Sequence, residues 1–463
     1  MQRDQAISAI EQYFDSGAFR KELEGLVRHR TESVLPGCGP ALMAYLEDSM
    51  IPMLQAMGFE CSIYPNPKSG AGPFLVAKRH EADDLPTVMT YGHGDVVPGF
   101  DDRWRDNLSP WQITELDGRW YGRGTADNKG QHCINLAAMR AVLETRGSLG
   151  FNTCLLIEMG EECGSPGLRS FCRDNSALFG ADVFIASDGP RIHPDAATVF
   201  MGSRGTFNFT MKLELREGGH HSGNWGGLLA NPAVIMANAL ATMIDDRGRI
   251  TVEGWKAEPM TDSVRSAIAK LTVGGGENMP EIDPDWGEPG MTPAERVFAS
   301  NTFEIRAFEA GNPASPANAI PPSATVWGHM RYVVGTMPED LLPALRRHLD
   351  SHGYQAITLH EERDPMYATR LDPAHPWAQW AIASLEKTAE REISVIPNLG
   401  GALPNDVFAD ILGLPTIWVP HSYAGCSQHA PDEHILPQLS RDALRLMTGL
   451  WWDLGAGATP YQG

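Results

Sequence analysis

Short apolar runs alternate along the chain with stretches of helical periodicity. The apolar runs predict strands buried on both faces of a sheet, and they lie at Thr87–Tyr91, Thr153–Glu158, Val183–Ser187 and Pro415–Val419. Apolar positions recur at helical spacing between them, as at Asn128–Glu144 and Pro166–Asp174, and over the first sixty residues, where Gly58 ends the run. This alternation predicts an α/β domain with a mostly parallel central sheet and helices on both faces.

The pattern changes near residue 202. Apolar and polar side chains then alternate, which is typical of an antiparallel strand with one exposed face. The predicted elements are a strand at Thr206–Arg216, a helix at Pro232–Ile244, a loop rich in glycine, proline and acidic residues at Val273–Thr292, and a strand at Ala324–Val333. We therefore expect a smaller α+β domain over residues 202–335, inserted into a discontinuous catalytic domain of residues 1–201 and 336–463.

Length, charge and cysteine usage narrow the class of protein. The 463 residues, 42% of them apolar, suffice for two well-buried cores. Lys and Arg total 37 against 58 Asp and Glu, and the net charge of −21 without a basic face excludes a nucleic-acid partner. No apolar run approaches the roughly twenty residues of a membrane span, and no signal-peptide segment follows Met1. Seven scattered cysteines without a Cys-x-x-Cys pair predict a cytoplasmic protein with free thiols.

Histidines and carboxylates follow the predicted strands or open the helix after one. These residues are His93, Asp95, Asp127, Glu161, Glu162, Asp188 and His429. Because the carboxyl ends of the strands form the ligand crevice of an open α/β sheet, we expect these side chains to converge there. Two imidazoles with several carboxylates are the donor set of a metal site.

The residue types fit a site for two divalent ions. A carboxylate can be shared between two ions about 3.5–4 Å apart, and each ion then takes one imidazole and one further carboxylate, with room for a bridging water. This count uses His93, His429, Asp127, Glu162 and Asp188 as ligands. Glu161 is left over, and it can act as the base for the water. Asp95 can orient the imidazole of His93 through its other N–H group.

Other catalytic classes fit less well. Gly122-x-Gly124 resembles half of a dinucleotide fingerprint, but the negative charge of Asp127 at its sixth position would repel a pyrophosphate, which disfavours a dehydrogenase. The sequence contains no Gly-x-Ser-x-Gly elbow and no phosphate-binding Gly-x4-Gly-Lys-Ser/Thr loop. A catalytically dead relative that only binds metal is a further alternative, and the presence of Glu161 beside intact ligands argues against it.

Five motifs in order resemble the co-catalytic zinc exopeptidase and amidohydrolase family of carnosine dipeptidase, aminoacylase, acetylornithine deacetylase, succinyl-diaminopimelate desuccinylase and glutamate carboxypeptidase. The motifs are His93-Gly94-Asp95, Gly122–Gly130, Glu161-Glu162, Asp188 and His429–Glu433. The resemblance implies that Asp127 bridges the metals, that His93 and Asp188 complete one site, and that Glu162 and His429 complete the other. It also implies that Glu161 is the general base and that the Asp127–Asn128 peptide bond is cis.

The inserted segment resembles the family's lid domain, which commonly dimerises. His221 in His221-Ser222-Gly223 matches its histidine motif, and the positions that resemble its substrate contacts are Asn318, Arg331, Gly400 and Gly401. The resemblance implies a homodimer through the inserted domain, in which His221 of one chain completes the oxyanion site of the other. A lid that closes over its own chain is the alternative.

We expect a metallopeptidase of the dipeptidase or carboxypeptidase type, which cleaves an amide bond next to a free carboxylate in a small-molecule substrate. By the same resemblance the cofactors are two divalent ions per subunit, expected to be Zn²⁺, with Mn²⁺ or Co²⁺ as alternatives. An N-acyl amino acid deacylase is the alternative activity. Asn128 stands where many relatives carry a second Asp, and Asn398-Leu399 differs from the charged residues of some relatives, so the identity of the substrate stays open.

Overall fold

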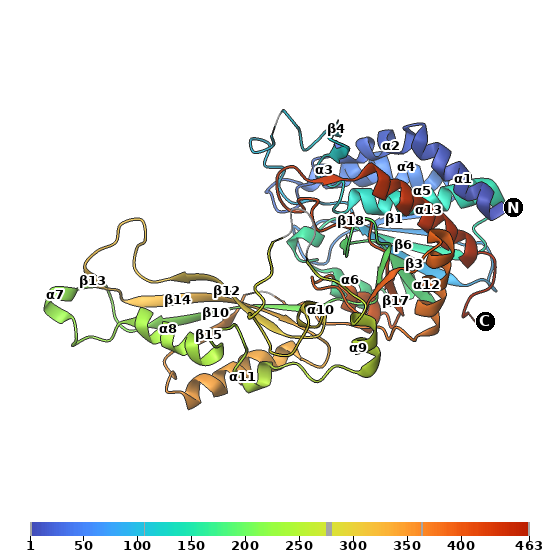
Figure 1. Ribbon diagram of the computed structural model, residues 1–463. Coiled ribbons are helices and arrows are strands. Elements are labelled where there is room, and N and C mark those ends of the chain that lie inside the picture. The colour runs from blue at the N-terminus through green and yellow to red at the C-terminus, as the bar shows by residue number, and fades with distance from the viewer. Residues whose placement is uncertain (1, 106, 275–279, 363, 462–463) are drawn as a thin grey trace.

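Two domains of unequal size make up the chain (Figure 1). The computed structural model describes residues 2–105, 107–274, 280–362 and 364–461. Both termini belong to the larger domain, and the smaller domain extends away from it as an elongated sheet with helices on one side. No helix in these residues combines the length and the hydropathy that a membrane crossing requires.

The larger domain contains an eight-stranded sheet. In spatial order its strands are β1 (Glu60–Tyr64), β2 (Phe74–Arg79), β6 (Asn152–Glu158), β3 (Thr87–His93), β7 (Val183–Ala186), β17 (Thr416–Trp418), β9 (Thr198–Phe200) and β16 (Ser394–Ile396). The central strands β6, β3, β7 and β17 are parallel to one another, and so are β9 and β16. Strand β1 is antiparallel to β2, and β2 is antiparallel to β6. The contact between β17 and β9 is also antiparallel.

Two hydrophobic clusters cover the two faces of this sheet. Strand β6 contributes side chains to both clusters, because Leu155 and Ile157 belong to the first cluster and Leu156 belongs to the second. The first cluster contains residues of α1 (Gln2–Asp15), α2 (Ala18–Val27), α3 (Gly39–Tyr45), a π-helical turn (Leu46–Met50), α4 (Ile51–Ala56), α5 (Lys129–Arg146), α12 (Pro376–Ala389) and α13 (Pro437–Leu454). The second contains residues of α6 (Leu168–Asp174), α9 (Asp262–Ile268), α10 (Pro293–Phe298) and the turns Ser176–Leu178 and Val407–Ile411. The predicted α/β sheet with helices on both faces is confirmed.

The smaller domain is built on a four-stranded antiparallel sheet. Its spatial order is β12 (Thr302–Glu309), β14 (Ser323–Tyr332), β10 (Gly205–Glu214) and β15 (Thr358–Glu361). The alternation predicted for β10 is present, since Phe207, Phe209, Met211 and Leu213 are buried in one cluster. The helices α8 (Pro232–Met243) and α11 (Pro338–Ser351) and the turn Glu253–Trp255 contribute to that cluster. The predicted loop at 273–292 has neither helix nor strand in the part that is described, and residues 275–279 lie outside the described residues.

The boundaries of the smaller domain differ from the predicted 202–335. Helix α11 buries Leu341, Leu345 and Leu349 in the cluster of the smaller domain, and β15 pairs with β10. The chain therefore returns to the larger sheet only after residue 361, so the predicted end at residue 335 is too early. Within the insertion, α9 and α10 pack into a cluster of the larger domain rather than into the smaller one.

Three short ribbons lie outside the two main sheets. The ribbon β4 (Thr114–Leu116), β5 (Arg119–Tyr121) and β19 (His434–Ile435) joins the segment before Asp127 to the segment after His429. A parallel pair, β8 (Pro190–Arg191) and β18 (Ser422–Tyr423), follows Asp188 and precedes His429. At the tip of the smaller domain β11 (His220–His221) pairs with β13 (Ala319–Ile320), beside the short helix α7 (Ser222–Trp225).

Candidate metal centre

The chemically active residues lie where the central strands end. His93 is the last residue of β3, Asp188 comes two residues after β7, and Glu161 and Glu162 begin a 3₁₀ turn (Glu161–Cys163) after β6. Asp127 precedes α5, and His429 lies in the loop after β18. Because three of these strands are adjacent and parallel, their ends meet at one edge of the sheet. The sequence alone predicts this convergence.

Five of these residues form two groups that share one carboxylate. His93, Asp127 and Asp188 form the first group, with His93 Nε2 3.0 Å from Asp127 Oδ1 and 3.6 Å from Asp188 Oδ2. Asp127, Glu162 and His429 form the second. In this group His429 Nε2 lies 2.9 Å from Asp127 Oδ2 and 3.2 Å from Glu162 Oε2. Each oxygen of Asp127 therefore faces a different imidazole, which is the arrangement of a carboxylate that bridges two ions.

The backbone before Asp127 is held by Glu433, which is the last residue of the His429–Glu433 motif and has no role predicted from the sequence. Glu433 Oε1 accepts hydrogen bonds of 3.0–3.1 Å from the backbone N–H groups of Gly124, Ala126 and Asp127. Its other oxygen accepts one of 2.6 Å from the buried guanidinium of Arg123. The peptide bond between Asp127 and Asn128 is cis, which confirms the expectation from the resemblance.

Asp95 contacts more than its predicted partner. His93 Nδ1 lies 3.1 Å from the backbone oxygen of Asp95 and 3.4 Å from its Oδ1. Both contacts favour a hydrogen on Nδ1, which leaves Nε2 of His93 as the ligand atom. The Asp95 carboxylate also accepts hydrogen bonds from the backbone N–H groups of Glu161 and Glu162, at 3.2 and 3.1 Å. It thus ties the end of β3 to the turn that carries both glutamates.

A buried chain of hydrogen bonds joins the start of α5 to the end of β7. The Asn128 side chain donates from Nδ2 to the backbone oxygen of Ser187, at 2.9 Å, so its Oδ1 faces His132 Nδ1 at 3.0 Å as the acceptor. His132 Nε2 lies 2.6 Å from the hydroxyl of Tyr45. Burial lowers the pKa of His132 to about 3, and a neutral ring can donate from Nδ1 and accept from Tyr45 at Nε2. These hydrogen bonds hold Asn128 and Ser187 in place, and these two residues are the sequence neighbours of the ligands Asp127 and Asp188.

The site contains several buried carboxylates that bound cations would stabilise. Burial and then the Asp127 carboxylate raise the pKa of Asp188 to about 6 and that of Glu162 to about 7. Burial also raises the pKa of Glu161 well above its usual value. Glu162 Oε1 and Asp188 Oδ2 are buried and have no hydrogen-bond partner among the described residues. Buried carboxylates are stable only when they are protonated, paired or bound to metal, so this donor set fits two divalent cations.

A cavity of about 360 Å³ opens over the two groups. Besides Asp127, Asp188 and His429 its lining includes Glu161, Arg331, Gly401 and Gln428. The cavity brings the predicted base Glu161 and the predicted carboxylate-binding Arg331 to the same space as the ligands. Gln428, which donates to Asp127 Oδ2, was not foreseen from the sequence.

The loop with Gly400 and Gly401 is held by its carbonyl groups. The backbone N–H of Arg204 donates to the oxygens of Leu399 and Gly401, and Arg204 Nε donates to the oxygen of Gly400 at 2.8 Å. Gly400 itself is packed against Val297, where a Cβ atom would lie 2.8 Å from Cγ1. Of the two predicted glycines, Gly401 lines the cavity over the metal ligands, and Gly400 is not among the described residues that line it.

His221 and Asn318 lie together, at a distance from the metal ligands of the same chain. Their strands pair so that His221 is opposite Ala319, and the backbone oxygen of Asn318 accepts from Ser222 N at 2.9 Å. This cluster is at the tip of the smaller domain (Figure 1). The His221 side chain is exposed, and its Nδ1 accepts from the backbone N–H of Gly223 at 3.1 Å.

The fold and the site define a class of enzyme. The α/β sheet brings together two imidazoles and three carboxylates, and one of these carboxylates, Asp127, is shared between the two groups. Glu161 lies in the same cavity. This is the arrangement of a hydrolase that uses two metal ions. Residues 89–453 match the model of Peptidase family M20/M25/M40, and the chain belongs to this family. The resemblance drawn from the five motifs is thereby confirmed.

Two curated proteins that are similar to this chain are dipeptidases. A cysteinylglycine-S-conjugate dipeptidase of Corynebacterium striatum is 29% identical over 287 residues, which cover 60% of this chain and 60% of that protein. The human Beta-Ala-His dipeptidase is 24% identical over 382 residues, covering 78% and 74% of the two chains.

Solved structures share the fold over nearly the full length. The M20 family metallo-carboxypeptidase Sso-CP2 from Sulfolobus solfataricus superimposes with a TM-score of 0.80 at 22% identity, covering 95% of this chain and 99% of the other. Human carnosine dipeptidase 1 superimposes with a TM-score of 0.77 at 21% identity, covering 98% and 99%. These two likenesses establish the two-domain M20 architecture.

Proposed function

We propose that this protein is a dipeptidase that hydrolyses the amide bond next to a free carboxylate, with two zinc ions bound in the two ligand groups. The observation that carries the proposal is the shared carboxylate of Asp127 between two imidazoles, with Glu161 and Arg331 lining the same cavity. When bound, the two ions would polarise the scissile carbonyl and make water a nucleophile near neutral pH.

The chain's own residues have distinct roles in this proposal. His93, Asp188 and Asp127 hold one ion, and Glu162, His429 and Asp127 hold the other. Glu161 takes a proton from the attacking water and returns it to the leaving amine. A base with a raised pKa suits both transfers, and burial raises the pKa of Glu161.

Arg331 sets the position of the substrate in this proposal. Its guanidinium can bind the terminal carboxylate through two parallel hydrogen bonds. The positive charge of Arg331 also acts on Arg204, since burial and then the charge of Arg331 lower the pKa of Arg204 to about 10. Arg331 lines the cavity, and a cation at this position favours a substrate with a free carboxylate over a neutral one.

A parallel assay of dipeptides and N-acyl amino acids tests this function. We expect the zinc-loaded protein to hydrolyse dipeptides, to lose that activity in a chelator and to regain it when zinc is restored. Amidated dipeptides, which lack the terminal carboxylate, should react much more slowly. Faster turnover of N-acyl amino acids than of every dipeptide would make the protein a deacylase, and no turnover of either class would refute the proposal.

We also propose that the protein is a homodimer formed through the smaller domain and that it works in the cytoplasm. Support for the dimer comes from large apolar side chains exposed on this domain, namely Trp225, Leu228, Val234, Ile305 and Phe308. Strand β12 is also an edge of its sheet. Support for the location comes from the seven cysteines, all of which are free thiols.

Mixing two inactive variants tests whether His221 acts on the partner's site. If it does, a heterodimer of His221→Ala and Glu161→Gln chains has one site with both defects and one site with neither, so activity should return to about a quarter of the wild-type level at random assortment. If each chain uses its own His221, every site keeps one defect and activity stays at the level of the separate variants. Sedimentation of the same samples would show whether heterodimers can form at all.

A further inference from the structure

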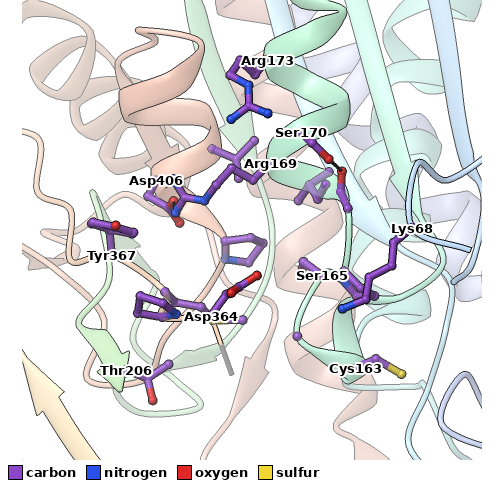
Figure 2. A pocket seen from close by; sticks show the side chains of 18 residues that line it. Lys68, Cys163, Ser165, Arg169, Ser170, Arg173, Thr206, Asp364, Tyr367 and Asp406 are labelled. Carbon is purple, nitrogen blue, oxygen red and sulfur yellow. Dashed lines mark hydrogen bonds and ion pairs between the residues drawn. The ribbon is translucent and has the colours of Figure 1, made fainter. Parts of the chain in front are cut away.

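A second cavity, of about 410 Å³, lies between the two domains (Figure 2). One wall is formed by the turn after Glu162 and the start of α6, and another by residues 364–367, which return from the smaller domain. Thr206 of β10 and Asp406 complete it, with Lys68 on the opposite side. None of the roles proposed above uses this space.

The second cavity adjoins the cavity over the metal ligands. Two segments line both cavities: Glu161 lines the metal cavity and Cys163 the second one, and Leu403 and Pro404 are divided in the same way. In addition, Arg331 of β14 lines the metal cavity and is paired across the sheet with Thr206 of β10, which lines the second cavity. A substrate whose scissile bond lies over the metal ligands can therefore extend past the Glu161–Cys163 turn into the second cavity.

Most charges in the second cavity are already paired. Arg169 forms an ion pair with the buried carboxylate of Asp406, and its guanidinium stacks 4.6 Å from the ring of Tyr367. Arg173 pairs with Asp174 at 3.2 Å. These contacts balance their own charges and leave little attraction for a ligand.

Two charges in the cavity are unpaired. Neither the ammonium of Lys68 nor the carboxylate of Asp364 has a hydrogen bond or ion pair with the described part of the chain. Figure 2 shows the two side chains reaching into the cavity from opposite sides. A ligand that satisfies both at once carries a carboxylate for Lys68 and an ammonium for Asp364.

We propose that the second cavity binds an α-amino-acid head group at the far end of the substrate, so that the enzyme hydrolyses dipeptides joined through the side-chain carboxyl of the first residue, such as γ-glutamyl dipeptides. The proposal rests on the proposed dipeptidase function. In an ordinary α-dipeptide the ammonium is one carbon from the scissile carbonyl and stays in the metal cavity. In a γ-linked dipeptide the ammonium and the carboxylate stand together, three carbons away. Water adds across the γ-amide bond, which yields glutamate and the free second amino acid.

Three substrates separate the two charges. γ-Glutamylglycine has both, glutarylglycine lacks only the ammonium, and 4-aminobutyrylglycine lacks only the carboxylate. We expect kcat/KM of the wild-type enzyme to be about tenfold higher for γ-glutamylglycine than for either analogue, since one charge-assisted hydrogen bond is worth that much at a partly exposed site.

Variants then assign each preference to a residue. Lys68→Met should abolish the preference over 4-aminobutyrylglycine and keep the preference over glutarylglycine, and Asp364→Asn should do the reverse. Lys21→Met and Asp84→Asn are matched controls, because both residues are exposed and lie outside the two cavities, and they should leave both preferences unchanged. Equal kcat/KM values for the three substrates would overturn the inference, and so would variants that slow all three alike.

Calorimetry on the metal-free protein separates this inference from the proposed function. We expect γ-glutamylglycine to bind about tenfold more tightly than 4-aminobutyrylglycine, and Lys68→Met to remove the difference. If this difference is found but the zinc-loaded protein hydrolyses no dipeptide, the proposed function fails and the binding site stands. If dipeptides are hydrolysed but the affinities are equal in wild type, the binding site fails and the function stands.

Discussion

Replacing Glu161 with Gln should lower kcat by about 10²–10⁴-fold while both zinc ions stay bound. The amide keeps the shape of the side chain but cannot accept the proton of the attacking water. Glu161 lines the cavity over the ligands, yet it is in neither of the two ligand groups. Its backbone N–H donates to Asp95, and this contact does not involve the substituted side chain. The measurement is kcat together with metal content by mass spectrometry.

The matched control for this prediction is Glu144→Gln. Glu144 is an exposed glutamate near the C-terminal end of α5, whereas Asp127 precedes the start of this helix. The Glu144→Gln substitution should therefore leave kcat and metal content unchanged. A Glu161→Gln protein with one zinc ion per chain would show that Glu161 is a ligand. A protein with both ions and nearly full kcat would show that another group is the base.

The position of the metal ligands could be predicted because it depends on local patterns. A buried strand ends at a polar residue, and adjacent parallel strands end at the same edge, so the order of motifs along the chain suffices to place His93, Asp188 and Glu162 near one another. The Asp127 motif is equally local, since it opens a helix. The prediction uses only the general rule that ligands bind at the carboxyl ends of parallel strands, and it does not need the order of the strands in the sheet.

Contacts between distant segments could not be predicted in this way. Glu433 stands four residues after His429, but its hydrogen bonds to the backbone at residues 124–127 join segments more than 300 positions apart. The periodicity of α11 is that of any amphipathic helix, and it does not say which of two cores the helix covers. The burial of α11 in the cluster of the smaller domain and the pairing of β15 with β10 place this segment in the smaller domain. Whether His221 serves its own chain or a partner depends on an interface that a single chain does not contain.

Replacing Asp127 with Ala should weaken the binding of both zinc ions together, by at least about 100-fold each. Partners that only orient a ligand are worth about 10–100-fold in metal affinity, and a shared ligand should be worth more. Asp127 Oδ1 faces His93 and Oδ2 faces His429, so its removal leaves each group with two ligands. Competition with a chromogenic chelator measures both affinities, and circular dichroism establishes that the variant is folded.

The informative comparison is Asp188→Ala, which removes a ligand from the first group only. This variant should keep one tightly bound zinc ion, whereas Asp127→Ala should keep none. The difference follows from geometry rather than from charge, because both substitutions remove one buried carboxylate from the same crevice. If Asp127→Ala also retains one tight ion, then one imidazole group holds its metal without the shared carboxylate, and Asp127 is not a ligand that both ions require.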